Sequence, residues 1–302
     1  MKYSYRHILK DVSRSFYLSM RLLPVAMREP VSLAYLLARA SDTLADTEGL
    51  DAQLRFEMLE GFGEILRGGD RVAWLAKLSD AVIPIQKHEG ETRLLEKISE
   101  IFDWLDGFEC ARGRSAILQV MEHIIHGQSL DIERFEIQQR HVLGEDAELE
   151  QYCFLVAGCV GEFWTEIGNI ALAEFSSIDT SQLKQMGGNY GKGLQLINIL
   201  RDLPADIRLG RCYLPGVNPA DYVAVTKEAA RWRTRARSYL SDGEKYAASL
   251  QSRRTRAATA LPGLIGERTI DLLDRASWED LERGVKVPRR DVYRFMWESF
   301  FV

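Results

Sequence analysis

Cysteine is scarce in this sequence. The four cysteines among 302 residues are Cys110, Cys153, Cys159 and Cys212, and no two of them form a C-x-x-C pair. The start of the chain shows no pattern typical of a secretory signal peptide. These features argue against a disulfide-stapled secreted domain, so we expect reduced thiols and a cytoplasmic location.

Long apolar runs and an excess of basic charge are also missing. No run approaches the ~18 apolar residues that a membrane span needs. The formal net charge is −5, which argues against a nucleic-acid partner because such proteins carry a basic surface. The aromatic stretch "DVYRFMWESFFV" (291–302) is interpreted as a docked terminal segment. The alternative is a peripheral contact with a membrane surface, which would assist product release.

What the sequence does have is an apolar, helical pattern. Apolar residues make up 46% of the chain, and there are only eight prolines. Apolar residues recur with helical spacing almost throughout, and short breaks are expected at "RGGD", "GEDAE", "RLGRCYLPG" and "ALPGLIGE". No linker and no fixed repeat is present. We predict one all-α domain over residues 1–302, expected to be a monomer, with helices at about 5–20, 24–46, 51–67, 71–81, 91–106, 113–126, 148–174, 180–203, 219–250, 254–276 and 288–300.

One of these helices carries a narrow polar stripe in an otherwise apolar surface. At about 100° per residue, positions 35, 39, 42 and 46 fall within a sector of roughly 60°. They are Tyr35, Arg39, Asp42 and Asp46. Leucine and alanine cover most of the remaining surface, so the pattern predicts that the stripe faces an internal cavity.

A second helix repeats this arrangement in "YGKGLQLINILRDLPADIRLG". Its stripe consists of Gly191, Gln195, Asn198, Asp202 and Asp206. Pro204 removes a backbone donor and clashes with the preceding turn, so we expect Asp206 at a kink or just beyond the helix.

Four aspartates on two such faces would repel one another if nothing neutralised them. Mg²⁺ binds carboxylate oxygens and keeps other positions for water and substrate phosphates. Arg39 and Arg201 stand close by in sequence and are suited to bidentate phosphate binding. The two pairs therefore suggest a metal-bridged diphosphate site, with salt-bridged helix faces as the alternative. A di-iron carboxylate bundle would use Glu-x-x-His pairs, which this sequence does not contain.

Five motifs together carry a resemblance to a known family. They are "SRSFYLSMRLLP" (13–24), "YLLARASDTLAD" (35–46), "YCFLVAGCVGEF" (152–163), "LQLINILRDLPADI" (194–207) and "GRCYLP" (210–215). In sequence and order they resemble the squalene/phytoene synthases, the head-to-head isoprenyl diphosphate synthases. The resemblance implies a single all-α isoprenoid-synthase domain around a central cavity.

The resemblance also implies a role for each matching residue. Asp42, Asp46, Asp202 and Asp206 would hold Mg²⁺, with more than one ion per site. Tyr35, Arg39, Tyr152 and Arg201 would be catalytic. The substrate's diphosphate and prenyl chains would be held by Ser13, Arg14, Phe16, Val156, Ala157, Gly158, Gly161, Gln195, Asn198 and Arg211.

In the terms of the resemblance, two farnesyl diphosphates condense to presqualene diphosphate, and hydride from NADPH then gives squalene. The lone "SD" of "RASDTLAD", where phytoene synthases often have "DD", favours squalene. Dehydrosqualene, hydroxysqualene, presqualene diphosphate and phytoene stay open as products. The alternative from a different functional class is a non-catalytic helical scaffold that retains the fold. The residues that would bind NADPH are not identified.

Two other motifs are interpreted as structural. "GGNYGKG" (187–193) lacks the preceding strand and the G-K-[ST] ending of a phosphate loop, so we interpret it as close helix packing. His123 and His126 stand three apart without a further ligand motif, which is weak evidence for zinc.

Overall fold

The computed structural model describes residues 5–13 and 20–301, with the side chains of Tyr5, Arg6 and Ser13 outside that description. The described chain is all-α, as the sequence predicts, and its β-structure is limited to two isolated bridges, Val142–Cys212 and Ser176–Leu250. Among the described helices, none is both long and apolar enough to cross a membrane. The chain divides into two compact units, residues 1–138 with 166–172 and residues 139–165 with 173–302.

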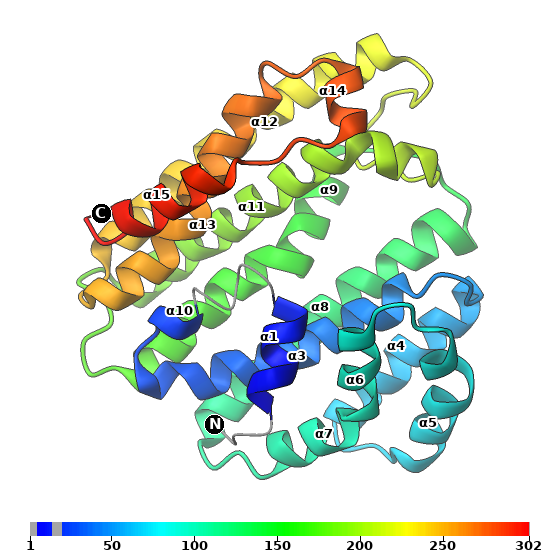
Figure 1. Cartoon of the computed structure of the whole chain (residues 1–302), viewed down its shortest axis with the longest axis vertical. Coiled ribbons are helices and arrows are strands. Elements are labelled where there is room, and N and C mark those ends of the chain that lie inside the picture. Colours follow the sequence, from blue (N-terminus) through cyan, green and yellow to red (C-terminus); the bar gives the residue numbers. More distant parts are fainter. Residues whose placement is uncertain (1–4, 14–19, 302) are drawn as a thin grey trace. The chain divides into compact units, whose positions relative to one another are not determined.

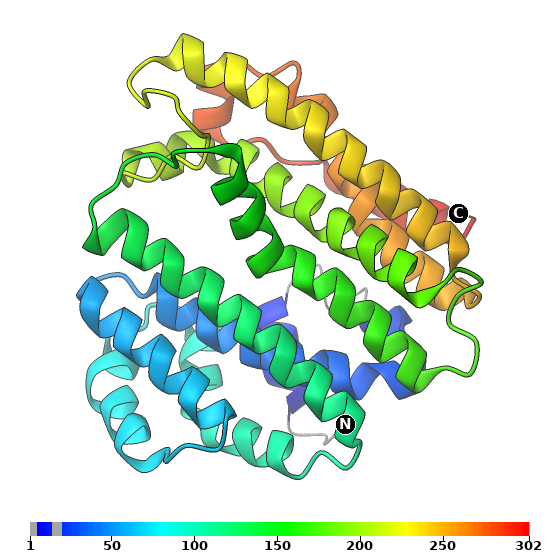
Figure 2. The ribbon, with the colours of Figure 1, turned by 180° about the vertical axis from the view of Figure 1, so that it is seen from behind.

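The first unit is built around α3 and α8, which pack against each other, and α4 covers both of them. The view in Figure 2 shows α4 alongside α8. Edge-to-face contacts among Phe62, Trp74 and Phe102 fill part of its core. Its elements are α1 (Tyr5–Ser13), α3 (Val25–Asp46), α4 (Ala52–Leu66), α5 (Val72–Lys77), η1 (Leu78–Val82), η2 (Ile83–Ile85), α6 (Glu89–Glu96), α7 (Ile98–Asp106), α8 (Ala111–Ile132) and η3 (Glu133–Ile137).

The second unit is built around α11, which packs against α12 and α13 (Figure 1). Trp232 and Tyr246 of α12 are among its largest fully buried side chains. The helix α10 begins in this unit, and its residues from Glu166 onward belong to the first. The elements are α9 (Asp146–Cys153), η4 (Phe154–Gly158), α10 (Cys159–Ala171), α11 (Thr180–Arg208), α12 (Tyr222–Ser249), α13 (Arg253–Leu273), α14 (Trp278–Arg283) and α15 (Arg289–Glu298).

Side-chain caps explain where several helices begin. Asp51, Asp179 and Asp221 accept hydrogen bonds from backbone N–H groups in the first turns of α4, α11 and α12. Ser277 and Asp280 form a reciprocal capping box at α14. These caps satisfy N–H groups that have no partner within the helix.

Two expectations about helix ends and breaks are corrected. Helix α11 continues through Pro204 to Arg208, so Asp206 lies inside the helix. Helix α13 likewise continues through Pro262, so the break expected at "ALPGLIGE" is wrong. Each proline removes only one backbone donor, and Pro204 and the segment before Pro262 are buried by packing, which offsets that loss. The short helix α14 was not expected.

The glycines of "GGNYGKG" are helix-packing residues, as the sequence predicts. A Cβ at Gly161 of α10 would lie 1.9 Å from the carbonyl oxygen of Gly187, and one at Gly191 would lie 2.2 Å from that of Ala157. Only glycine permits backbones to approach this closely. The glycines of this motif therefore allow the backbone of α11 to lie close to those of η4 and α10.

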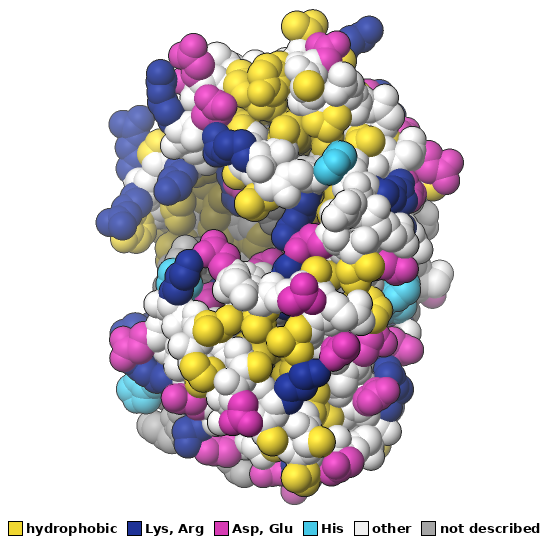
Figure 3. Space-filling model, turned by 90° about the vertical axis from the view of Figure 1, so that its right-hand side faces the viewer, with side chains coloured by type: hydrophobic (Ala, Val, Ile, Leu, Met, Phe, Trp, Pro, Cys, Tyr) yellow, Lys and Arg dark blue, Asp and Glu magenta, His cyan; other side chains and the backbone are white. Residues whose placement is uncertain are grey.

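Acidic and basic side chains are interspersed over much of the face in Figure 3. Hydrophobic side chains also reach the surface there, as they do on soluble proteins generally. This mixture agrees with the small net charge of −5.

Candidate active site

In the first unit, the polar stripe of α3 lines a cavity of about 230 Å³. The cavity's ionisable lining residues come from α3, from the turn after it and from the chain near the start of α6, and they are Arg39, Asp42, Asp46, Glu48, Lys87, His88 and Glu91. Tyr35 lies on the same face further toward the N-terminus and donates a hydrogen bond to the carbonyl of Val12, 3.1 Å away. The stripe thus lines a cavity as its spacing predicts.

The stripe is more open than expected. The Asp42 side chain keeps 45% of its surface accessible, and Asp46 is exposed. Asp46 is the last residue of α3, so the following turn leaves it at the edge of the packed helix. Asp42 is therefore half-buried and Asp46 exposed, at a cavity that is open where the pattern predicts an internal one, and ligands can approach both carboxylates from it.

Arg39 is held in the cavity by acidic groups. Its guanidinium pairs with Glu91 of α6 and lies 3.9 Å from the Asp42 carboxylate. Its Nε is buried and has no hydrogen-bond partner in the part of the chain that the structure describes. Glu91 fixes the direction of the arginine, while one donor is left for another group.

Asp42 is the carboxylate whose ionisation the surroundings alter most clearly. Burial against the surrounding protein raises its pKa to about 6, and the nearby Asp46 charge adds to this. Arg39 and a 2.5 Å hydrogen bond from Gln128 of α8 act in the opposite direction. A divalent cation would favour the ionised form that this environment disfavours.

We expect Gln128→Met to weaken activation by Mg²⁺ about tenfold, the lower range for partners that orient metal ligands. The amide stabilises the ionised carboxylate, so its loss raises the pKa of Asp42 further. The acid limb of the Mg²⁺-dependent rate then moves to higher pH. The measurement is the half-saturating Mg²⁺ concentration from pH 5.5 to 8. The exposed Gln138→Met is the control, and identical profiles for both variants would contradict this role.

In the second unit, α11 presents the other stripe. Arg201 makes two hydrogen bonds to Asp202, 2.9 Å from Nε and 2.5 Å from an Nη atom, and these raise the pKa of Arg201. Asn198 lies about one turn earlier and Gln195 about two turns earlier, and the two contact each other at 3.4 Å. The structure therefore brings these residues together along one helix. Asp206 follows one turn later.

The segment after α11 contains Arg211 and Tyr213, and Tyr213 contacts Tyr152 of α9. The backbone N–H of Leu143 donates to the Cys212 carbonyl, and that of Cys212 donates to the His141 carbonyl. The backbone N–H of Arg211 donates to the Asp206 carbonyl at 2.9 Å. Tyr152 of α9 stacks on Tyr213, with ring centroids 4.9 Å apart. This segment fixes Arg211 close to the end of α11.

Val156, Ala157 and Gly158 lie in the π-helical turn η4, between α9 and α10. Such turns are often found at functional sites. The structure explains Gly158 and Gly161 by packing, because a Cβ on either would meet backbone atoms of α11. The role of these residues along a prenyl chain stays a prediction. Arg14, Phe16 and the side chain of Ser13 lie outside the described residues.

Sequence reasoning missed several charged or polar partners. Gln128 and Glu91 contact the α3 stripe from 86 and 52 residues away along the chain. In the second unit, Lys192 of α11 bonds to Glu150 at 2.8 Å and to Tyr239 at 2.9 Å. No local pattern around these residues signals such contacts, because they depend on which helices pack together.

The fold is that of the isoprenoid synthases. A solved structure of TcSQS with a bound ligand superposes with a TM-score of 0.77, at 20% identity and over 97% of this chain and 84% of that one. The family model for squalene/phytoene synthase matches residues 9–291. The chain therefore belongs to the squalene/phytoene synthase family, whose members join prenyl diphosphates head to head with Mg²⁺.

Two curated relatives illustrate the range of that family. A presqualene diphosphate synthase of Rhodopseudomonas palustris is 26% identical over 92% of this chain and 87% of its own length. A bifunctional lycopene cyclase/phytoene synthase of Blakeslea trispora is 28% identical over 69% of this chain. The chain spans about a third of that relative's length, 31%.

Proposed function

We propose that this protein condenses two farnesyl diphosphates head to head to presqualene diphosphate, and then uses NADPH to reduce it to squalene. The observation that carries the proposal is the pair of polar stripes on α3 and α11. Each has two aspartates and a nearby arginine. A non-catalytic scaffold would not require these groups. Two acidic stripes of this kind are suited to an enzyme that releases diphosphate.

The residues present fit Mg²⁺ bound together with a substrate. No group of three or more His, Cys, Asp or Glu side chains suited to a metal occurs in the described chain. Mg²⁺ commonly takes one or two carboxylates and completes its coordination with water and phosphate. We propose Asp42 with Asp46, and Asp202 with Asp206, as these carboxylates. When bound, Mg²⁺ stabilises negative charge on the departing diphosphate.

The chain's own cations would bind the diphosphate directly. Arg39 lines the cavity of the α3 stripe, and its guanidinium is suited to a phosphate oxygen bound there. Arg201 can exchange its contacts with Asp202 for phosphate when the carboxylate binds metal. Asn198, Gln195 and Arg211 add donors along the same helix and the segment after it. The stacked faces of Tyr152 and Tyr213 are suited to a carbocation, which aromatic rings stabilise.

A second candidate is an enzyme that stops at presqualene diphosphate. The Rhodopseudomonas palustris relative of that name aligns over most of both chains, and this favours the candidate. The single "SD" of α3 favours squalene over phytoene and does not distinguish these two candidates. Both products arise from the same first condensation, so the two aspartate pairs have the same role in either case.

The test is product identification after incubation of the purified protein with farnesyl diphosphate and Mg²⁺. We expect presqualene diphosphate without NADPH and squalene with it. Presqualene diphosphate under both conditions would select the second candidate. Phytoene from geranylgeranyl diphosphate, with farnesyl diphosphate inert, would contradict the substrate assignment. Absence of any condensed product would favour the scaffold alternative.

A further inference from the structure

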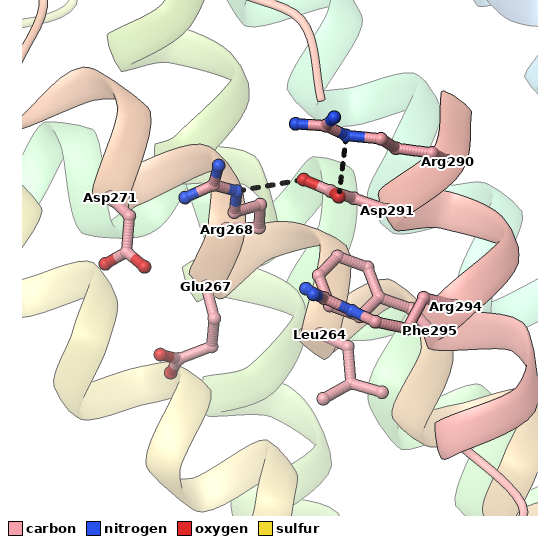
Figure 4. Close-up of a pocket in the computed structure, with 8 residues that line it drawn as sticks. All are labelled: Leu264, Glu267, Arg268, Asp271, Arg290, Asp291, Arg294 and Phe295. Atoms are coloured by element: carbon pink, nitrogen blue, oxygen red, sulfur yellow. Dashed lines mark hydrogen bonds and ion pairs between the residues drawn. The ribbon is translucent and has the colours of Figure 1, made fainter. Parts of the chain in front are cut away.

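Helix α15 docks on α13 through one face only. Asp291 is buried and lies between Arg268 of α13, at 3.2 Å, and Arg290, at 3.7 Å (Figure 4). Phe295 and Ser299 continue the buried face at intervals of four residues. These contacts fix the rotation of α15 about its axis, so its opposite face points toward solvent.

The outward face carries three large aromatic side chains. Tyr293 and Trp297 of α15, and Phe301 three residues beyond its end, also follow at intervals of four residues, and they are 68%, 69% and 65% exposed. The rings of Trp297 and Phe301 contact each other, with centroids 4.5 Å apart. Single exposed apolar residues are ordinary, but an aromatic group of this kind indicates a surface that binds something.

Basic side chains lie within the same sector of the helix. At about 100° per residue, Arg289, Arg290 and Arg294 fall in the same sector of roughly 140° as Tyr293 and Trp297, and all three arginines are exposed. The helix has two acids. Asp291 points inward, and Glu298 pairs with Arg294 at 3.4 Å. Arg290 pairs with Asp291 and Arg294 with Glu298, but the three arginines outnumber the two acids, so the outward face is aromatic with a small net positive charge.

We propose that this face of α15 binds the surface of an anionic lipid bilayer. Tryptophan and tyrosine favour the interface between water and hydrocarbon, and arginines are attracted to anionic headgroups. A ten-residue helix is about 15 Å long, half the hydrocarbon thickness, so α15 would lie in the interface. The charge complementarity favours anionic lipid over a second copy of this chain, whose α15 would carry like charges.

The test is flotation of the full chain with vesicles of phosphatidylcholine, with or without 30% phosphatidylglycerol, in about 0.1 M salt. We expect binding to the anionic vesicles and at least tenfold weaker binding to the neutral ones. The double variant Trp297→Ser/Phe301→Ser, and separately Arg289→Gln/Arg294→Gln, should each weaken anionic binding at least tenfold. The control Val25→Ser/Val72→Ser, whose valines are 75% and 71% exposed, should bind like the parent.

Equal binding to neutral and anionic vesicles, or no binding, would overturn the proposal. So would full binding by either α15 variant, with circular dichroism showing that each is folded. Concentration-dependent dimerisation that the aromatic variant abolishes, without vesicle binding by the parent, would instead identify a second copy as the partner. None of the α15 residues varied here belongs to either aspartate stripe, so the outcome does not depend on the proposed function.

Discussion

Asp42→Asn should lower Mg²⁺-dependent turnover of farnesyl diphosphate at least about 100-fold, comparable to losing one strong stabiliser of transition-state charge. An amide is a far weaker ligand for Mg²⁺ than a carboxylate, and the substitution is nearly isosteric. The cavity and the contact with Gln128 should therefore persist. The measurement is the steady-state rate with saturating Mg²⁺, beside Asp80→Asn as an exposed control on the same unit.

A rate for Asp42→Asn within about threefold of the parent would contradict the metal assignment in α3. Asp202→Asn tests the α11 stripe in the same way. If Asp42→Asn is inactive but Asp202→Asn is not, the first stripe alone would carry the metal chemistry. Circular dichroism must show that each variant is folded, because a misfolded protein would mimic the expected loss.

The same substitution should have the opposite effect on the stability of the metal-free protein. The pKa of Asp42 is raised from 3.8 to about 6 by folding, so the folded state binds more protons than the unfolded state between these values. Stability therefore falls as pH rises from about 4 to about 6 and then stays level. Asp42→Asn removes this loss and should stabilise the metal-free protein at pH 7 by up to about 1 kcal/mol, allowing for solvent screening.

Thermal unfolding in a chelator at pH 4.5 and pH 7 measures this effect. The parent should lose stability relative to Asp42→Asn as pH rises between them. A parallel dependence in the two proteins would contradict the raised pKa.

The second large effect concerns the crossing of α10 and α11. Gly161→Ala should destabilise the protein by about 3 kcal/mol, the upper range for overpacking a tight core. The added Cβ would lie 1.9 Å from the carbonyl oxygen of Gly187 and 2.3 Å from its carbon. Both are backbone atoms, so the clash cannot be relieved by rotating a side chain. The helices must separate instead.

Gly188→Ala is a matched control for this prediction. It also adds a methyl group at the crossing, but its nearest neighbours are Glu162 side-chain atoms at 3.7 and 3.8 Å. Alanine favours a helix by about 1 kcal/mol over glycine, so this variant should be as stable as the parent or more so. Denaturant unfolding of both variants measures the difference. Equal stability would show that the crossing is looser than the structure indicates.

The sequence predicts the helices well where apolar periodicity dominates. Residues 24–46 were expected to be helical and α3 covers Val25–Asp46, while residues 51–67 correspond to α4, Ala52–Leu66. The predicted end of the helix near Pro204 is wrong. The local effect of proline indicated that the helix stops there, but packing of α11 against its neighbours keeps the helix intact to Arg208. The pattern contains no linker, and the expectation of a single domain stays a prediction.

The sequence predicts only part of the candidate site. The spacing of Arg39, Asp42 and Asp46 predicts a shared face, since one helix determines it. The contacts of Gln128 and Glu91 come from other helices, and their positions depend on how those helices pack. The exposure of Asp46 depends on where the chain turns after α3, which periodicity does not specify.

The most direct test of head-to-head condensation is the stoichiometry of a reaction without NADPH. With Mg²⁺, we predict that two farnesyl diphosphates are consumed for each inorganic diphosphate released, and that the organic product is presqualene diphosphate. The reaction should stop in a chelator. Release of one diphosphate for every farnesyl diphosphate, with only farnesol formed, would show hydrolysis without carbon–carbon bond formation and would contradict the account.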